Sequence, residues 1–101
     1  MNWFDSHCHL KGFFNKGILE EILSRARENR VFRMTAIGTS SKDWNLYEDL
    51  STKYKGEIFH SVGLHPCYVN ERFDQEIENL ETFLESPNPP VALGEIGLDY
   101  F

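Results

Sequence analysis

Two histidines near the N-terminus alternate with a cysteine in a pattern that could bind a metal ion. His7 and His9 flank Cys8, so in an extended backbone both imidazoles point to one side of the strand and the thiol points to the other. By the same alternation, Asp5 is expected on the side of the histidines. The pattern is weak alone, because four histidines in 101 residues give a pair at this spacing by chance with a probability of about 0.15. A structural or surface role for the pair therefore stays open.

Other side chains that bind metals follow two later apolar segments. His65 stands just before Pro66, and Glu95 and Asp99 follow the last apolar run. One alternative is that His65 caps a turn before Pro66, and another is that Glu95 is a charge paired within the protein. A buried carboxylate without a partner is costly unless a cation or a hydrogen-bond donor compensates it. This cost favours a functional role for Glu95.

The hydrophobic pattern places these side chains after the strands of an α/β fold. Strands are expected at residues 2–6, 31–39, 58–64 and 91–96, and three helices at 16–30, along the stripe Trp44, Tyr47, Leu50 and Tyr54, and along the stripe Ile77, Leu80, Phe83 and Leu84. Asn15 is the expected N-cap of the first helix, and Ser40 or Ser41 that of the second. Alternating strands and helices predict parallel strands joined by crossover helices. Since parallel α/β folds carry ligands at the carboxyl ends of their strands, the candidate side chains are expected at one edge.

Composition predicts one domain, residues 1–101, in a cytoplasmic protein without a membrane partner. The chain is 41% hydrophobic and 26% charged, and it has neither an apolar run of about 18 residues nor a signal-peptide pattern. Cys8 and Cys67 are expected to be reduced thiols with packing roles. The net charge is −6, and residues 71–101 carry one basic and eight acidic side chains. Such a chain repels a phosphate backbone at long range unless bound cations reverse the charge locally.

Three motifs occur in order along the sequence. They are Asp5-Ser6-His7-Cys8-His9-Leu10, Gly63-Leu64-His65-Pro66 and Gly94-Glu95-Ile96-Gly97-Leu98-Asp99-Tyr100. Together they resemble the TatD family of metal-dependent deoxyribonucleases over essentially the whole sequence. The resemblance implies the N-terminal portion of an amidohydrolase-like TIM-type (β/α)8 barrel. It also implies a hydrolase that uses two divalent cations, either zinc, manganese or magnesium, to cleave phosphodiester bonds of DNA.

The resemblance also implies roles for individual residues. His7 and His9 would bind one cation, and Glu95 would be the catalytic carboxylate that bridges both. Asp5, His65 and Asp99 would either hold the metal ligands in position or contact the substrate phosphate. Asp5 is expected to accept the second ring proton of a metal-binding histidine.

Half of the implied site has no counterpart in this sequence. The family's remaining ligands are two histidines and an aspartate on later strands. The sequence also predicts only four strands and three helices, whereas a complete barrel has eight strand-helix units in about 250 residues. We therefore expect a fragment of a longer enzyme, weakly active or inactive alone. Two alternatives are a short natural product and a half-barrel that self-associates through its exposed edges. Other amidohydrolase-type hydrolysis and a non-catalytic metal-binding or interaction module are the alternative functions.

Overall fold

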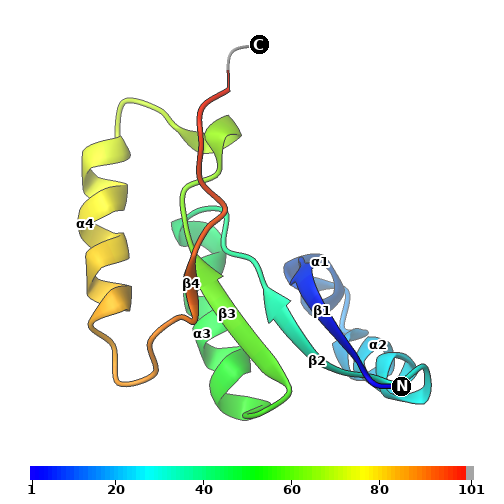
Figure 1. The fold of residues 1–101 in the computed structure, drawn as a ribbon. Coiled ribbons are helices and arrows are strands. Elements are labelled where there is room, and N and C mark those ends of the chain that lie inside the picture. The colour runs from blue at the N-terminus through cyan, green and yellow to red at the C-terminus, as the bar shows by residue number, and fades with distance from the viewer. Residues whose placement is uncertain (100–101) are drawn as a thin grey trace.

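A computed structural model describes residues 1–99 of the chain (Figure 1). Tyr100 of the third motif lies outside the described residues. The elements, in chain order, are β1 (Trp3–Cys8), α1 (Lys11–Asn15), α2 (Leu19–Glu28), β2 (Val31–Ala36), α3 (Ser41–Lys53), β3 (Ile58–Val62), the 3-10 helix η1 (Pro66–Tyr68), α4 (Phe73–Leu84) and β4 (Ala92–Leu93). No helix in this part of the chain combines the length and the hydropathy of a transmembrane span.

The four strands form one parallel sheet in the order β1-β2-β3-β4. Ala36 of β2 lies opposite Cys8 on one side and opposite His60 on the other. Because the order in space follows the order in the chain and helices connect the strands, the fold is the first part of a TIM-type barrel. The predicted α/β class and the four parallel strands are confirmed.

The first predicted helix, residues 16–30, is the shorter helix α2, and an additional short helix, α1, precedes it, so the described part of the chain has four α-helices and not three. Gly17 separates them with a φ of +73°, a left-handed conformation that favours glycine and ends α-helices. The prediction that Asn15 is an N-cap is wrong, because Asn15 is the last residue of α1. Ile18 caps α2 without a side-chain hydrogen bond.

Helix α3 begins where the sequence predicts. The Ser40 side chain accepts the Lys42 N–H and the Asp43 carboxylate accepts the Ser40 N–H, which together form a capping box. The last strand differs from the prediction, since β4 has two residues. The Gly94 N–H still donates to the Val62 carbonyl of β3 at 2.8 Å, and the Glu95 N–H then donates to the Gly38 carbonyl, beyond the end of β2, at 2.8 Å.

The core lies between the sheet and the helices behind it (Figure 1). Its buried members come from β2, β3, α2, α3 and the residues around α1: Leu10, Leu19, Leu23, Met34, Ala36, Tyr47, Leu50 and Ile58. The other face of the sheet is not covered by a described helix. There Phe4 stacks on Phe59 with ring centroids 5.7 Å apart, and Phe4 is 50% exposed.

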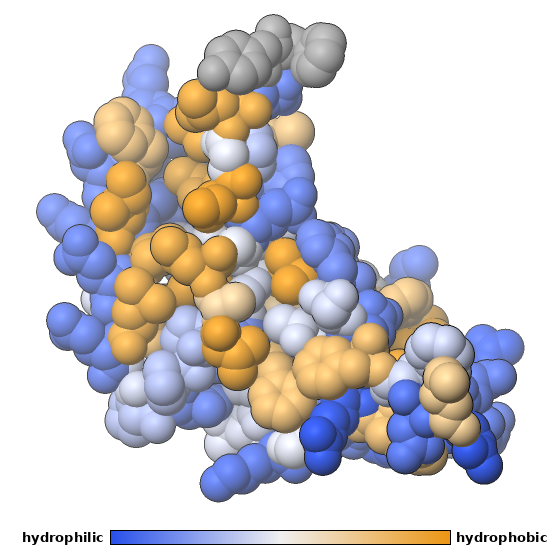
Figure 2. Space-filling view, in the orientation of Figure 1, coloured by the Kyte–Doolittle hydropathy of each residue, from blue (hydrophilic) through white to orange (hydrophobic). Residues whose placement is uncertain are grey.

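A second apolar surface lies between β4 and α4. Leu93 and Ile96 face Ile77 and Leu80 across a cavity of about 370 Å³, and Figure 2 shows apolar side chains gathered over these two elements. Leu93, Ile96 and Ile77 are each about half exposed. Exposed apolar area of this extent is typical of a surface that contacts further protein.

Candidate metal centre

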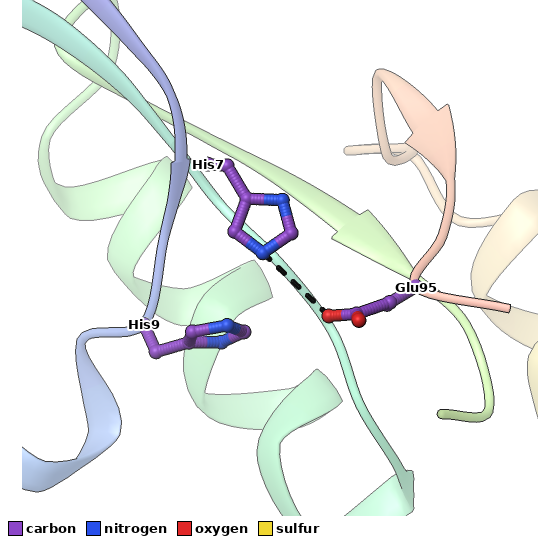
Figure 3. A group of neighbouring side chains, drawn as sticks. All are labelled: His7, His9 and Glu95. Carbon is purple, nitrogen blue, oxygen red and sulfur yellow. Dashed lines mark ion pairs between the residues drawn. The ribbon is translucent and has the colours of Figure 1, made fainter. Parts of the chain in front are cut away.

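The structure brings His7, His9 and Glu95 together (Figure 3). One ligand atom of each residue lies within 4.8 Å of the others, and the two imidazole rings meet edge to face with centroids 5.1 Å apart. His7 belongs to β1 and Glu95 follows β4, which are the two edges of the sheet. The sheet curls as part of a barrel does, so its opposite edges supply one cluster.

The donors of this cluster fit a divalent cation. Two imidazole nitrogens and a carboxylate oxygen are common ligands of zinc and manganese. Ligands about 2.1 Å from one ion lie at most about 4.2 Å apart, which is close to the 4.8 Å within which the three ligand atoms lie. His7 and His9 are exposed, and their rings can turn without displacing the core.

The Glu95 carboxylate lies between two histidines. Its Oε2 is 3.5 Å from His7 Nε2, and its Oε1 is 3.1 Å from His65 Nε2. His65 Nδ1 accepts the Cys67 N–H at 3.0 Å, so the neutral ring carries its proton on Nε2. His65 therefore caps the turn before Pro66, as one alternative expected, and also points a donor at Glu95.

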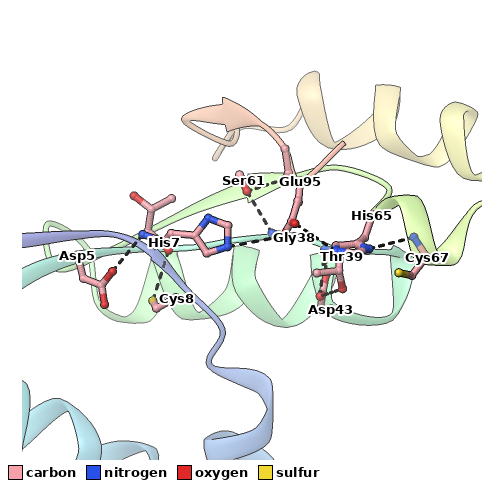
Figure 4. Close-up of polar contacts among 12 residues, drawn as sticks. Asp5, His7, Cys8, Gly38, Thr39, Asp43, Ser61, His65, Cys67 and Glu95 are labelled. Carbon is pink, nitrogen blue, oxygen red and sulfur yellow. Dashed lines mark hydrogen bonds and ion pairs between the residues drawn. The ribbon is translucent and has the colours of Figure 1, made fainter. Parts of the chain in front are cut away.

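The main chain that carries Glu95 is held by the ends of β2 and β3 (Figure 4). The Ser61 hydroxyl donates to the Gly94 carbonyl at 2.7 Å and accepts the Gly38 N–H at 3.1 Å. A Cβ atom at Gly63 would lie 2.7 Å from the nitrogen of Glu95. This segment can approach β3 only because residue 63 has no side chain.

Asp5 contacts the centre differently from the prediction. The pairing of β1 with β2 is irregular between Asp5 and Cys8, which oppose Met34 and Ala36, so Asp5 is on the side of Cys8 and not on that of the histidines. Its carboxylate accepts the His7 backbone N–H at 3.1 Å, in place of the expected ring proton. Asp5 thus supports the backbone at His7.

The two cysteines have different environments. Cys8 packs against the core and its thiol donates to the Thr35 carbonyl at 3.4 Å. Burial, with a contribution from the Asp5 carboxylate, raises the pKa of the Cys8 thiol to about 12. The packing role predicted for Cys67 is wrong, because Cys67 is exposed, lines the cavity of the centre and donates to Asp99 Oδ2 at 3.6 Å. Asp99 is therefore placed beside the centre.

Tyr47 is a residue at the centre that the sequence did not reveal. It is 1% exposed, and its hydroxyl accepts the N–H groups of Leu10 and Lys11 at 3.0 and 3.2 Å. These two residues directly follow His9, so Tyr47 fixes the backbone at the second histidine. Burial raises the pKa of the Tyr47 hydroxyl. The only indication in the sequence was a phenol within an apolar stripe, which needs a buried partner.

The cavity over the cluster measures about 510 Å³. Its lining includes all three candidate ligands and also His65, Lys11, Thr39, Asp43 and Tyr68. The Asp43 carboxylate is occupied by the Thr39 N–H at 3.0 Å and by the Thr39 hydroxyl at 2.5 Å. Among these side chains, Lys11 supplies positive charge at the rim.

Comparison with known proteins agrees with the three motifs. Residues 4–101 match the family model described as TatD related DNase. The chain belongs to the TatD-related DNase family. The uncharacterised metal-dependent hydrolase YjjV of Escherichia coli K12 is 32% identical over 98% of this chain. The human deoxyribonuclease TATDN3 is 27% identical over 95% of it.

This TatD-family chain covers only part of its relatives. It spans 38% of the length of each of those two proteins, and 39% of a metal-dependent hydrolase of Haemophilus influenzae that is 24% identical to it. The matched part contains β1 to β4 and the cluster of His7, His9 and Glu95. The relatives therefore have about three fifths of their sequence beyond the matched region.

Proposed function

We propose that the chain provides one half of the metal centre of a hydrolase that cleaves phosphodiester bonds in DNA. The observation that carries this proposal is the convergence of His7, His9 and Glu95 at the carboxyl ends of parallel strands. Active sites of (β/α) barrels lie at this end. The names of the relatives, metal-dependent hydrolase and deoxyribonuclease, support the reaction class.

Each residue has a role that follows from its position. His7 and His9 would hold one cation, and Glu95, the catalytic carboxylate, would be shared between it and a second. When bound, the cations supply Lewis-acid polarisation of the phosphoryl group and a water that is acidic enough to attack near neutral pH. His65, with its donor on Nε2, keeps Glu95 in place and lines the cavity that would receive the substrate phosphate. Asp99 and Asp5 support the segments on either side.

The charge at this edge suits an anionic substrate better than the net charge suggests. Lys11 lines the cavity, and its Nζ donates to the carbonyl of Lys42 at 3.2 Å. The lining of this cavity includes no side chain of α4, although Glu76 in the first turn of α4 contacts Ser41 at the start of α3. Two cations added to the cluster would make the region around His9 positive.

We further propose that the centre is completed by two histidines and an aspartate on later strands, which correspond to the part of the relatives that this chain does not cover. Alone, the 101-residue chain is then weakly active or inactive. Association of chains through the edge strands β1 and β4, a single domain at residues 1–101 and a cytoplasmic location remain predictions. Analytical ultracentrifugation over a range of concentrations would test the association.

Phosphorus NMR of a thymidine dinucleotide tests the proposal. Manganese held by the cluster should broaden the phosphodiester resonance beyond the effect of free manganese, and His9→Ala should abolish the excess. Glu85→Ala, which removes an exposed carboxylate at the C-terminal end of α4, is the matched control. Product resonances should appear slowly or not at all. The absence of excess broadening would contradict a phosphodiester site, whereas rapid hydrolysis by this chain would contradict an incomplete centre.

A further inference from the structure

A groove adjoins the metal centre. It is a cavity of about 730 Å³ between the first turn of α3 and residues 66–72. Cys67 and Tyr68 line both this groove and the cavity over the metal centre, so the two spaces are adjacent. The segment that carries Cys67 and Tyr68 follows β3 through η1 at the carboxyl end of the sheet (Figure 1). A ligand larger than one phosphate would extend from the centre into this groove.

Tyr68 presents an aromatic ring where the two spaces meet. It is 53% exposed, and its ring centroid is 5.7 Å from that of His65, whose Nε2 contacts Glu95. A single imidazole therefore separates the tyrosine ring from the proposed bridging carboxylate. Exposed aromatic rings beside a phosphate site are the usual stacking platforms for unpaired bases.

The groove also contains two cations suited to phosphates. They are Lys42 and Arg72, and Arg72 is the single basic residue among residues 71–101. Two carboxylates share the lining. That of Glu76 accepts the Ser41 N–H and hydroxyl, at 3.1 and 2.7 Å, which hold it in place without removing its charge. Glu71 is the second carboxylate, so an anion must bind through Lys42 and Arg72 themselves.

We propose that this groove binds the nucleotide next to the scissile phosphate, with its base stacked on Tyr68 and its outer phosphate near Lys42 and Arg72. The inference rests on the proposed function and names the part of the substrate that the centre itself cannot recognise. Stacking accepts any base, so the groove contributes affinity and register and not sequence preference. Tyr68 is a specificity-determining residue for an unpaired nucleotide.

Fluorescence anisotropy with two probes tests the stacking. One probe is a phosphorothioate oligodeoxynucleotide, which resists cleavage, and the other is the same backbone without bases. Tyr68→Ala should weaken binding of the first at least about fivefold and leave the second unchanged, while Tyr68→Phe should retain both. Phe14→Ala, an exposed aromatic residue in a separate cavity, is the control. Equal binding by Tyr68→Ala and wild type, or no binding of the oligonucleotide at all, would overturn the proposal.

The phosphate contacts have their own test. The double variant Lys42→Gln/Arg72→Gln should weaken both probes and lower the salt dependence by about 0.7 for each lost contact with a single strand. The control is Lys53→Gln/Arg25→Gln, which removes the same charge outside the groove. An unchanged salt dependence would contradict these contacts.

Calorimetric titration of manganese into the same variants separates this inference from the proposed function. If manganese binds normally but oligonucleotide affinity does not depend on Tyr68, the proposed nucleotide groove is contradicted and the proposed metal centre is retained. If oligonucleotide affinity depends on Tyr68 but the chain does not bind manganese, the proposed metal centre is contradicted and the proposed nucleotide groove is retained.

Discussion

His65 Nε2 lies 3.1 Å from Glu95 Oε1, and this contact joins two strand ends that are 30 residues apart in the chain. The opposite ring nitrogen of His65 accepts a backbone N–H, which leaves Nε2 as the proton donor. The contact therefore makes His65 a positioning residue for the carboxylate rather than a ligand. The same ring caps the turn before Pro66, so one side chain orders both the loop and the centre.

Replacing His65 should weaken metal binding without abolishing it. His65→Ala leaves the Glu95 carboxylate without its donor, and loss of such a supporting contact costs about 10- to 100-fold in metal affinity. His9→Ala, which removes a ligand, should abolish specific binding. Calorimetric titration with zinc measures both. Equal loss in the two variants would mean that His65 is itself a ligand.

Tyr47→Phe should loosen the backbone at His9. The variant leaves the buried N–H of Leu10 without its acceptor, at a cost of about 1–3 kcal/mol in the free energy of unfolding. Metal affinity should fall as well, because the displaced segment carries a ligand. Urea unfolding and zinc titration measure the two effects. The control is Tyr54→Phe, whose hydroxyl contacts Glu20 at the surface, and a similar result for both variants would contradict the role of Tyr47.

Gly63→Ala should displace Glu95. The added Cβ would lie 2.7 Å from both the nitrogen and the carbonyl oxygen of Glu95, so the backbone must shift and the three ligand atoms must separate. Gly12→Ala in α1 meets no atom within 4 Å and should leave metal affinity unchanged. Zinc titration of the two variants decides the point. Unimpaired binding by Gly63→Ala would show that Glu95 does not depend on this close approach.

Acidification should destabilise the fold through His60. Its ring is 1% exposed, and its Nε2 has no hydrogen-bond partner in the described part of the chain. Burial lowers the pKa of His60, so below the unfolded value of about 6.5 the unfolded state binds more protons than the folded state. The free energy of unfolding therefore does not depend on His60 above that pH. Below it, protonation of His60 in the unfolded state lowers the free energy of unfolding by up to about 1.4 kcal/mol per pH unit.

Urea unfolding between pH 5.5 and 7.5 measures this dependence. His60→Leu removes the titrating group and keeps an apolar side chain of similar size, so its stability should vary less with pH than that of the wild type. The other three histidines are common to both proteins and cancel in the comparison. An equal pH dependence of the two proteins would contradict the assignment to His60.

The sequence predicts the arrangement of strands because its helices have clear apolar stripes. The stripe around Trp44 and the box formed by Ser40 and Asp43 define α3, and the prolines after Leu84 end α4. Alternation along β1 correctly separates Cys8 from His7 and His9. Each of these features depends on residues that are close together in the sequence, so the sequence alone is enough to predict it.

Features that depend on irregular backbone or on long-range approach were not predictable. The irregular pairing near Asp5 reverses the side on which its carboxylate lies, and helix α1, with five residues, is too short to show an apolar stripe. Tyr47 resembled an ordinary core residue. The meeting of His7 with Glu95 requires the sheet to curl, and no stretch of sequence shows that curvature.

The most direct test of the metal centre is calorimetric titration of zinc or manganese into the 101-residue chain and its His7→Ala and Glu95→Ala variants. Glu85→Ala serves as the control for removal of an exposed carboxylate. Our account predicts specific binding by the wild type and the control, and its loss in both His7→Ala and Glu95→Ala. No specific binding by the wild type, or binding that survives both substitutions, would contradict it.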